Sequence, residues 1–232
     1  MPEVDPGGML CVVMPTVIAI DGPAGSGKST LARRLASELG LAYVNTGLMY
    51  RALAAAALRA GIGLDDEDAL AGAARALTFG LDDGRPRQLL VGGRQPGPEL
   101  ASAEVEAVVS RVSRHPAVRA VLRAQQRALG AGGAVVEGRD IGTAVFPDAP
   151  LKIFLAATTV ARTGRRAAER GARDDAVARD LERRDRLDDR TNPLRPAPGA
   201  HVLDSTALSR DQVANAALAL ARGAGIAARR AT

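Results

Sequence analysis

A glycine-rich segment near the start of the sequence has the residue types and spacing of a phosphate-binding loop. It reads Gly22-Pro23-Ala24-Gly25-Ser26-Gly27-Lys28-Ser29 and is followed by Thr30. Glycines let backbone N–H groups turn inward around phosphate oxygens, and a helix that begins at the lysine adds positive potential. In this pattern Lys28 reaches the β- and γ-phosphates, and the Ser29 hydroxyl holds Mg²⁺. The segment therefore predicts a site for ATP and Mg²⁺.

Arginines beside turns and strand ends form a second candidate group. Arg51 ends the segment Thr46–Arg51, Arg119 lies in a predicted helix, and Arg139 directly follows an apolar run. Ligands bind at the carboxyl ends of parallel strands. Because phosphoryl transfer between two polyanions requires several cations around the transition state, these arginines indicate a site for a phosphate-bearing acceptor.

The composition favours a single globular domain and leaves another explanation of the arginines open. The chain has 232 residues and a formal charge of +5, with 47% hydrophobic and 2% aromatic residues. Lys28 and Lys152 are its only lysines, so the codon bias of a GC-rich genome could account for any single arginine. No basic tract is interleaved with aromatics that could stack on bases, and we expect no nucleic-acid partner. The lone Cys11 provides neither a disulfide framework nor a cysteine metal site.

The N-terminal residues show no targeting pattern. They carry acids where a secretion signal is positively charged, and the sequence has no apolar run of about 18 residues. We expect a cytoplasmic monomer with no membrane partner. Residues 1–15 are predicted to be a disordered extension, and Met9 and Met14 are alternative starts.

The predicted elements alternate between strands and helices. Thr16–Ile20 reads as a buried strand, and Lys28–Leu39 reads as the helix that follows the glycine-rich loop. Thr46 is predicted to cap a helix that reaches Ala60. Further strands are predicted at Leu41–Val44, Ala134–Glu137, Leu151–Leu155 and His201–Leu203, and further helices at Ser102–Arg114, Pro116–Leu129, Val160–Arg190 and Asp211–Arg222. This order predicts a three-layer α/β fold of the P-loop NTPase type with a central parallel sheet.

The pattern of predicted elements changes between Gly61 and Gly97. A short acidic helix near Asp66–Arg75 precedes two predicted strands, Ala76–Leu81 and Gln88–Val91, around an Asp-Asp-Gly turn. This region is predicted to be a small inserted lobe.

From Val17 to Leu220 the chain resembles the bacterial cytidylate kinases, members of the nucleoside monophosphate kinase group. The most specific stretch is Val136-Glu137-Gly138-Arg139-Asp140-Ile141-Gly142-Thr143, followed by Val145–Ala149. Other matching stretches are Ile20–Thr30, Asn45–Arg51, Ser110–Gln126 and Val202–Thr206. The resemblance implies transfer of the γ-phosphoryl group of ATP to CMP and dCMP.

The resemblance also implies a division into parts. The core would comprise residues 16–60 and 102–232, the NMP-binding lobe about 61–101, and the lid about 166–180. The lid would close over ATP and exclude water. One or two of four flanking arginines would reach the ATP phosphates: Arg162, Arg165, Arg166 and Arg170.

The acceptor-site residues are likewise implied by the resemblance. Thr46, Tyr50 and Arg51 would line the site, with Arg51 on the CMP phosphate. Ser110, Arg119 and Asp140 would read the cytosine edge. The remaining roles are phosphate binding by Arg139 and Arg190, sugar binding by Arg184 and Asp188, and catalysis by Lys28, Arg139 and Arg190.

Several alternatives stay open for these residues. Tyr50 could belong to the core, Ser110 could be solvated, and the segment from Arg184 to Arg190 could be a solvated helical face. The sequence also departs from the family pattern, with Asn45 in place of Asp, Ala101 in place of Arg, and a shortened stretch at 184–194 that affects the register of Arg190.

Two other functions share the same scaffold. One is another small-molecule P-loop kinase, acting on AMP, dTMP or shikimate; the other is a nucleotide-binding switch module without catalysis. A guanine-nucleotide switch would carry an Asn-Lys-x-Asp segment, and Lys152 has no such neighbours. A carboxylate that accepts from the cytosine amino group would face an acceptor in uracil, so UMP is expected to be a poorer substrate.

Overall fold

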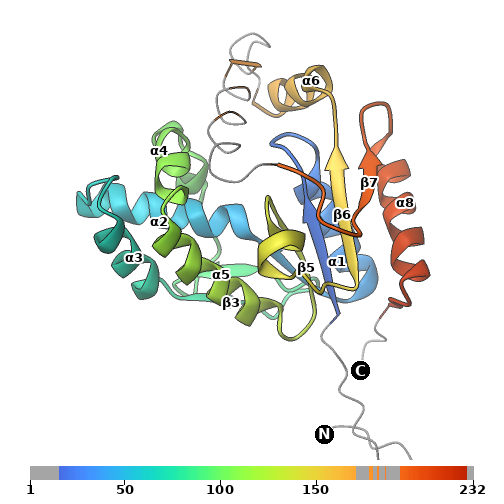
Figure 1. Ribbon diagram of the computed structural model, residues 1–232, viewed down its shortest axis with the longest axis horizontal. Helices are drawn as coiled ribbons and strands as arrows, with labels where there is room; N and C mark the ends of the chain where they lie inside the picture. Colours follow the sequence, from blue (N-terminus) through green and yellow to red (C-terminus); the bar gives the residue numbers. More distant parts are fainter. Residues whose placement is uncertain (1–15, 171–177, 180–181, 183–185, 187–193, 229–232) are drawn as a thin grey trace, which may run out of the picture.

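A parallel sheet forms the centre of the molecule, with strand order β2-β5-β1-β6-β7 (Figure 1). The computed structural model describes residues 16–170, 178, 179, 182, 186 and 194–228. The strands are β1 (Val17–Asp21), β2 (Ala42–Asn45), β5 (Ala134–Gly138), β6 (Leu151–Ala156) and β7 (His201–Asp204).

Helices cover both faces of this sheet, which confirms the predicted three-layer α/β fold (Figure 1). The helices are α1 (Lys28–Leu39), α2 (Thr46–Ala60), α3 (Glu67–Ala76), α4 (Ala103–Ser113), α5 (Pro116–Gly130), α6 (Thr159–Arg170) and α8 (Arg210–Gly223). Two short turns of helix are η1 (Pro98–Ala101) and the π-helical η2 (Ile141–Val145). No described helix is long and apolar enough to cross a membrane.

Strand β1 is buried along its whole length and supplies both faces of the sheet. Ile18 and Ile20 join the apolar cluster that contains α1 and α8, whereas Val17 and Ala19 join the cluster on the opposite face. Side chains alternate between the faces of a strand, so an unbroken apolar run is required where both faces are covered. This explains why the glycine-rich loop follows a run of only apolar residues.

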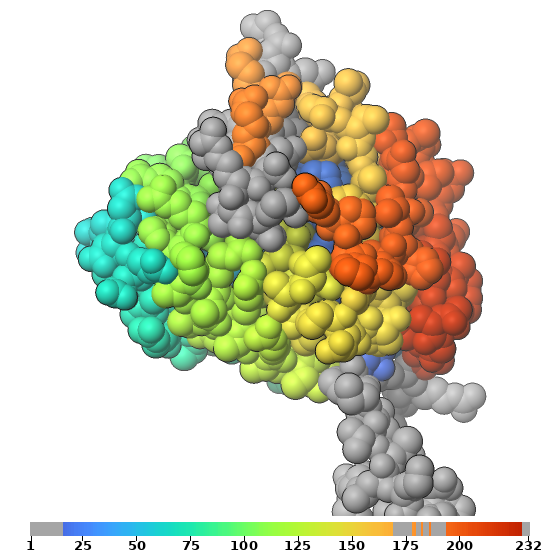
Figure 2. Space-filling view, viewed as in Figure 1, coloured from blue at the N-terminus to red at the C-terminus, as the bar shows by residue number. Residues whose placement is uncertain are grey.

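The segment 61–101, which the sequence predicts to be a lobe, contains α3, η1 and an antiparallel hairpin of β3 (Phe79–Leu81) and β4 (Leu89–Val91). Its Leu70 and Leu89 share one apolar cluster with Met49 of α2, Val105 of α4 and Leu122 of α5. The cyan and green residues of these segments gather on one side of the molecule, away from the red α8 (Figure 2). The lobe thus shares its hydrophobic core with the helices that carry Ser110 and Arg119.

The predicted cap of α2 is wrong by one residue. Asn45 is the N-cap, and its side chain accepts a hydrogen bond from the Leu48 N–H at 3.2 Å. Thr46 is the first helical residue, and its Oγ1 donates to the backbone oxygen of Glu137 at 2.8 Å. Both residue types can cap a helix, but the Thr46 side chain is buried against β5 and is used there. Most of the helix predicted beyond Arg170 lies outside the described residues.

Candidate active site

The glycine-rich loop connects β1 to the N-terminus of α1, as the sequence predicts. Gly27, the N-cap of α1, has φ 96° and ψ 13°, a left-handed conformation that favours glycine. A Cβ at Gly22 would lie 2.4 Å from the backbone oxygen of Leu155, so the neighbouring strand leaves no room for a side chain. The Lys28 ammonium donates to the Pro23 carbonyl oxygen at 2.8 Å and so lies back across the loop. The loop, the lysine and the helix N-terminus therefore form a ready anion site.

Glu137 lies at the end of β5, next to this loop, and was not among the site residues predicted from the sequence. Its side chain is buried, and the Ser29 hydroxyl donates to Oε2 at 3.0 Å. The Tyr43 hydroxyl donates to Oε1 at 2.5 Å. Burial, together with the Glu137 charge, raises the pKa of Tyr43, so the phenol remains a donor. The sequence did carry a signal for this residue, because Glu137 is an acid at the end of a predicted apolar strand.

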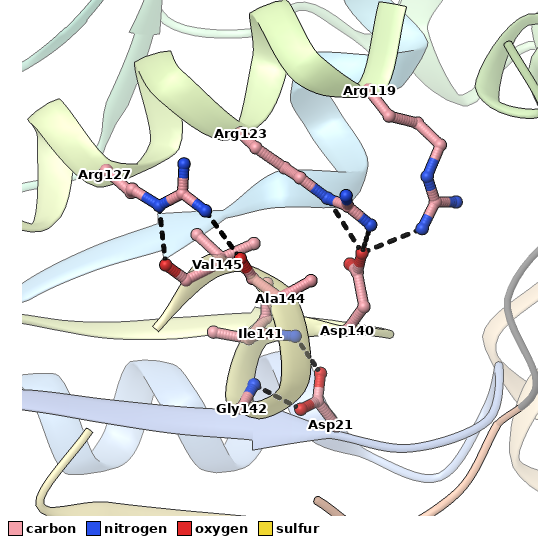
Figure 3. A network of polar contacts seen from close by, with 9 residues as sticks. All are labelled: Asp21, Arg119, Arg123, Arg127, Asp140, Ile141, Gly142, Ala144 and Val145. Atoms are coloured by element: carbon pink, nitrogen blue, oxygen red, sulfur yellow. Dashed lines mark hydrogen bonds and ion pairs between the residues drawn. The ribbon is translucent and has the colours of Figure 1, made fainter. Parts of the chain in front are cut away.

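Asp21 is a second buried acid that sequence reasoning missed. It ends β1, immediately before the loop, and its carboxylate accepts from the backbone N–H groups of Ile141 and Gly142, each at 2.8 Å (Figure 3). Burial raises the pKa of Asp21 despite these two hydrogen bonds. Asp21 thereby fixes the turn that carries Arg139 and Asp140 directly beside the phosphate-binding loop.

Two arginines of α5 converge on Asp140, which is itself buried (Figure 3). Arg119 Nη2 lies 2.9 Å and Arg123 Nη2 lies 2.6 Å from the same oxygen, Oδ2. Arg119 and Asp140 were predicted to lie together at the acceptor base, and the structure brings them into direct contact. Arg123 was not predicted.

A single cavity of about 270 Å³ brings most of the predicted residues together. The loop contributes Ala24, Gly25, Lys28 and Ser29 to its lining. The acceptor residues in the lining are Thr46, Tyr50, Arg51, Ser110, Arg119, Arg139 and Asp140. The other residues predicted to bind ATP do not line the cavity: Gly22, Pro23, Ser26 and Gly27 of the loop, and Thr30 of α1. Arg184, Asp188 and Arg190 lie outside the described residues.

Tyr50 lines this cavity, so it is not only a residue of the hydrophobic core. Burial, reinforced by the negative charge of Asp140, raises the pKa of Tyr50 to about 12. Its hydroxyl therefore stays protonated near neutral pH and is available as a hydrogen-bond donor to a ligand.

The three described arginine side chains of α6 divide into two groups, and the side chain of Arg170 lies outside the described part of the chain. Arg162 Nη1 donates to the Ala24 oxygen at 3.0 Å, and Arg165 Nη1 donates to the Ser26 oxygen at 3.2 Å, so both hold the glycine-rich loop. Arg166 instead lines the cavity and reaches Glu106 of α4, with Nη2 3.0 Å from Oε1. Arg51 Nη2 lies 3.6 Å from the same carboxylate oxygen. One buried acid thus pairs with an arginine of α2 and an arginine of α6, both of which line the cavity.

The fold and this cavity, which is lined by the glycine-rich loop and by several arginines, define a P-loop phosphotransferase. The family model described as cytidylate kinase matches residues 18–223. The chain belongs to the cytidylate kinase family.

Relatives of this family match nearly the whole chain. The cytidylate kinase of Mycobacterium avium (strain 104) is 47% identical over 209 residues, covering 85% of this chain and 91% of that protein. The cytidylate kinase of Listeria monocytogenes (strain EGD-e) is 42% identical over 212 residues, covering 88% of this chain and 95% of that protein. Among solved structures, TT1252 from Thermus thermophilus is 25% identical, with a TM-score of 0.43 and coverage of 89% of this chain and 97% of that chain.

Proposed function

We propose that this protein transfers the γ-phosphoryl group of ATP to CMP and dCMP, giving ADP with CDP or dCDP. The observation that carries the proposal is the single cavity lined by Lys28 and Ser29 on one side and by Arg51, Arg139 and Asp140 on the other. A donor and an acceptor bound in one cavity can meet without an intervening step. The names of relatives that share more than two fifths of their sequence with this chain support the choice of a cytidine nucleotide.

On the donor side, the loop amides and the α1 N-terminus would hold the ATP phosphates, with Lys28 on the β- and γ-phosphates. Arg166 is the α6 arginine that lines the cavity and is our choice for a further phosphate contact. The Ser29 hydroxyl and the Glu137 carboxylate are adjacent oxygen ligands of the kind that Mg²⁺ prefers, so these residues fit the ion. When bound, Mg²⁺ would neutralise charge on the phosphates.

On the acceptor side, Arg51 and Arg139 would bind the CMP phosphate, and Thr46 and Tyr50 would line its site. Ser110, Arg119 and Asp140 would read the cytosine edge, since a carboxylate accepts from the amino group that distinguishes cytosine from uracil. Arg190 would add a phosphate contact, and Arg184 and Asp188 would contact the sugar.

Catalysis would consist of positioning and electrostatic stabilisation. The transferred group passes through a loose transition state, so cations around it lower the barrier without covalent chemistry by the protein. We propose that residues 166–180 act as the lid and residues 61–101 as the NMP-binding lobe. We further propose that the protein acts as a monomer in the cytoplasm.

A substrate panel tests the proposal. Release of ADP from MgATP is followed in one coupled assay with CMP, dCMP, UMP, AMP, dTMP and shikimate. CMP or dCMP should give the highest kcat/KM, and Asp140→Ala should raise the KM for CMP more than the KM for ATP. The highest activity on another acceptor would assign a different kinase function, and a lack of CMP-dependent ADP release would leave only the switch module.

A further inference from the structure

Arg123 makes the closest contact to Asp140 in the cavity wall, although neither the P-loop nor the phosphate sites require it (Figure 3). Two of its nitrogens face one carboxylate oxygen, with Nε 3.2 Å and Nη2 2.6 Å from Oδ2. Arg119 contributes a single nitrogen to the same oxygen. We infer that Arg123 is a positioning residue for base selection, which holds Asp140 in the orientation that discriminates cytosine from uracil. The inference rests on the proposed function.

The contacts from Arg119 and Arg123 hold Oδ2 of Asp140, and they do not involve Oδ1. Within the described part of the chain, the side-chain hydrogen bonds that the Asp140 carboxylate accepts all go to Oδ2. Asp140 lines the cavity, so Oδ1 is the oxygen available to a ligand there. The terminal torsion of an aspartate is broad and nearly two-fold, and it needs external contacts to choose one position. The planar guanidinium of Arg123 supplies such a contact in a fixed geometry.

This orientation bears directly on the choice of base. An ionised carboxylate only accepts hydrogen bonds, so Oδ1 suits the amino donor of cytosine and opposes the carbonyl oxygen of uracil. If Arg123 is removed, the carboxylate can turn and no longer presents Oδ1 to the amino group of cytosine. This change favours uracil relative to cytosine.

The neighbouring Arg127 shows what a purely structural arginine on this helix does. It lies one turn further along α5, and its Nε and Nη2 donate to the backbone oxygens of Val145 and Ala144 at 2.9 and 2.6 Å. These bonds tie α5 to η2, the same two elements that Arg123 connects, without touching Asp140 (Figure 3). Arg127 is therefore a matched control for loss of the helix contact alone.

The experiment compares Arg123→Gln with Arg127→Gln, measuring kcat/KM for CMP and for UMP together with the melting temperature. Arg123→Gln should lower the CMP to UMP ratio about 10-fold or more, as expected for loss of a hydrogen bond to a charged group. Arg127→Gln should lower the melting temperature and leave the ratio unchanged. Arg123→Lys keeps the charge with one donor nitrogen, so it should restore part of the ratio, and it also serves if Arg123→Gln fails to fold.

An unchanged ratio in both Arg123 variants, or an equal loss for CMP and UMP, would overturn the inference and make Arg123 a structural residue. A wild-type protein that does not prefer CMP to UMP would instead contradict the proposed function. The two failures are therefore distinguishable in one set of measurements.

Discussion

The hydroxyl of Ser29 on α1 donates a hydrogen bond to Oε2 of Glu137 at the end of β5, over 3.0 Å. The contact joins the phosphate-binding helix to the strand that pairs with β1. Tyr43 holds the other oxygen of Glu137 from β2, so the carboxylate is fixed between two neighbours. A hydroxyl and a carboxylate held this way are preorganised for a hard cation.

Glu137→Gln should lower kcat about 10- to 100-fold and raise the Mg²⁺ concentration needed for half-maximal activity, because the amide is a poorer partner for the cation and for Ser29. Initial rates over a range of Mg²⁺ at fixed ATP measure both effects. Tyr43→Phe removes the contact to Oε1 and the hydrogen bond from Asn45, leaves the Ser29 contact in place, and should have a smaller effect. An unaltered Mg²⁺ requirement in Glu137→Gln would separate this acid from the metal.

Lys28→Ala should lower kcat by roughly 10³-fold or more, because a cation at the transferring phosphate is lost from the transition state. Binding of CMP alone, measured by calorimetry, should be nearly unchanged. Lys152→Ala is the matched control, since this half-buried lysine of β6 donates only to the Pro198 oxygen among the described residues. Equal losses in the two variants would argue against a direct function of Lys28.

Glu106→Gln should raise the KM for CMP and for ATP about 10-fold, because Arg51 and Arg166 lose the charge that orients them. Steady-state kinetics with each substrate varied in turn measure the change. Glu104→Gln removes the same charge from an exposed position on the same helix and should be silent. A lower KM for CMP in Glu106→Gln would show that the carboxylate competes with phosphate.

Asp21→Asn should change how stability depends on pH. The pKa of Asp21 lies above its ordinary value of 3.8 in the folded protein, mainly because of burial. The folded state then binds the proton more tightly than the unfolded state, so this carboxyl lowers the free energy of unfolding as pH rises from 3.8 through the raised pKa. Asparagine does not titrate.

The measurement is the free energy of unfolding of both proteins at a series of pH values. The variant minus wild-type difference should shift in favour of the variant across that interval and become constant above it. Exposed acids such as Asp65, Asp82 and Asp204, whose pKa values are lowered, have the opposite pH dependence, and they cancel in the difference. A flat difference would contradict the raised pKa.

Much of this protein could be predicted from short stretches of sequence. The spacing from Gly22 to Ser29 predicted the phosphate-binding loop, because its glycines, lysine and hydroxyl act within one turn of chain. Apolar runs and helical periodicity predicted the parallel sheet and its covering helices, since each pattern reflects burial that its own residues must satisfy. Resemblance added the acceptor residues Arg51, Arg119 and Asp140, and the structure places all three in one cavity.

Only the tertiary structure decided which of several similar side chains lie in the site and which groups they contact. In the sequence, Glu137 and Asp21 are only acids at the ends of predicted strands. In the folded protein, the pairing of β1 with β5 brings Glu137 beside Ser29 and Asp21 beside the backbone N–H of Gly142. Likewise, Arg166 lines the cavity while Arg165 holds the loop, because adjacent positions on a helix face different directions. Local patterns are encoded by neighbours in the chain, whereas strand register and helix facing are set by packing between distant segments, so these assignments required the folded molecule.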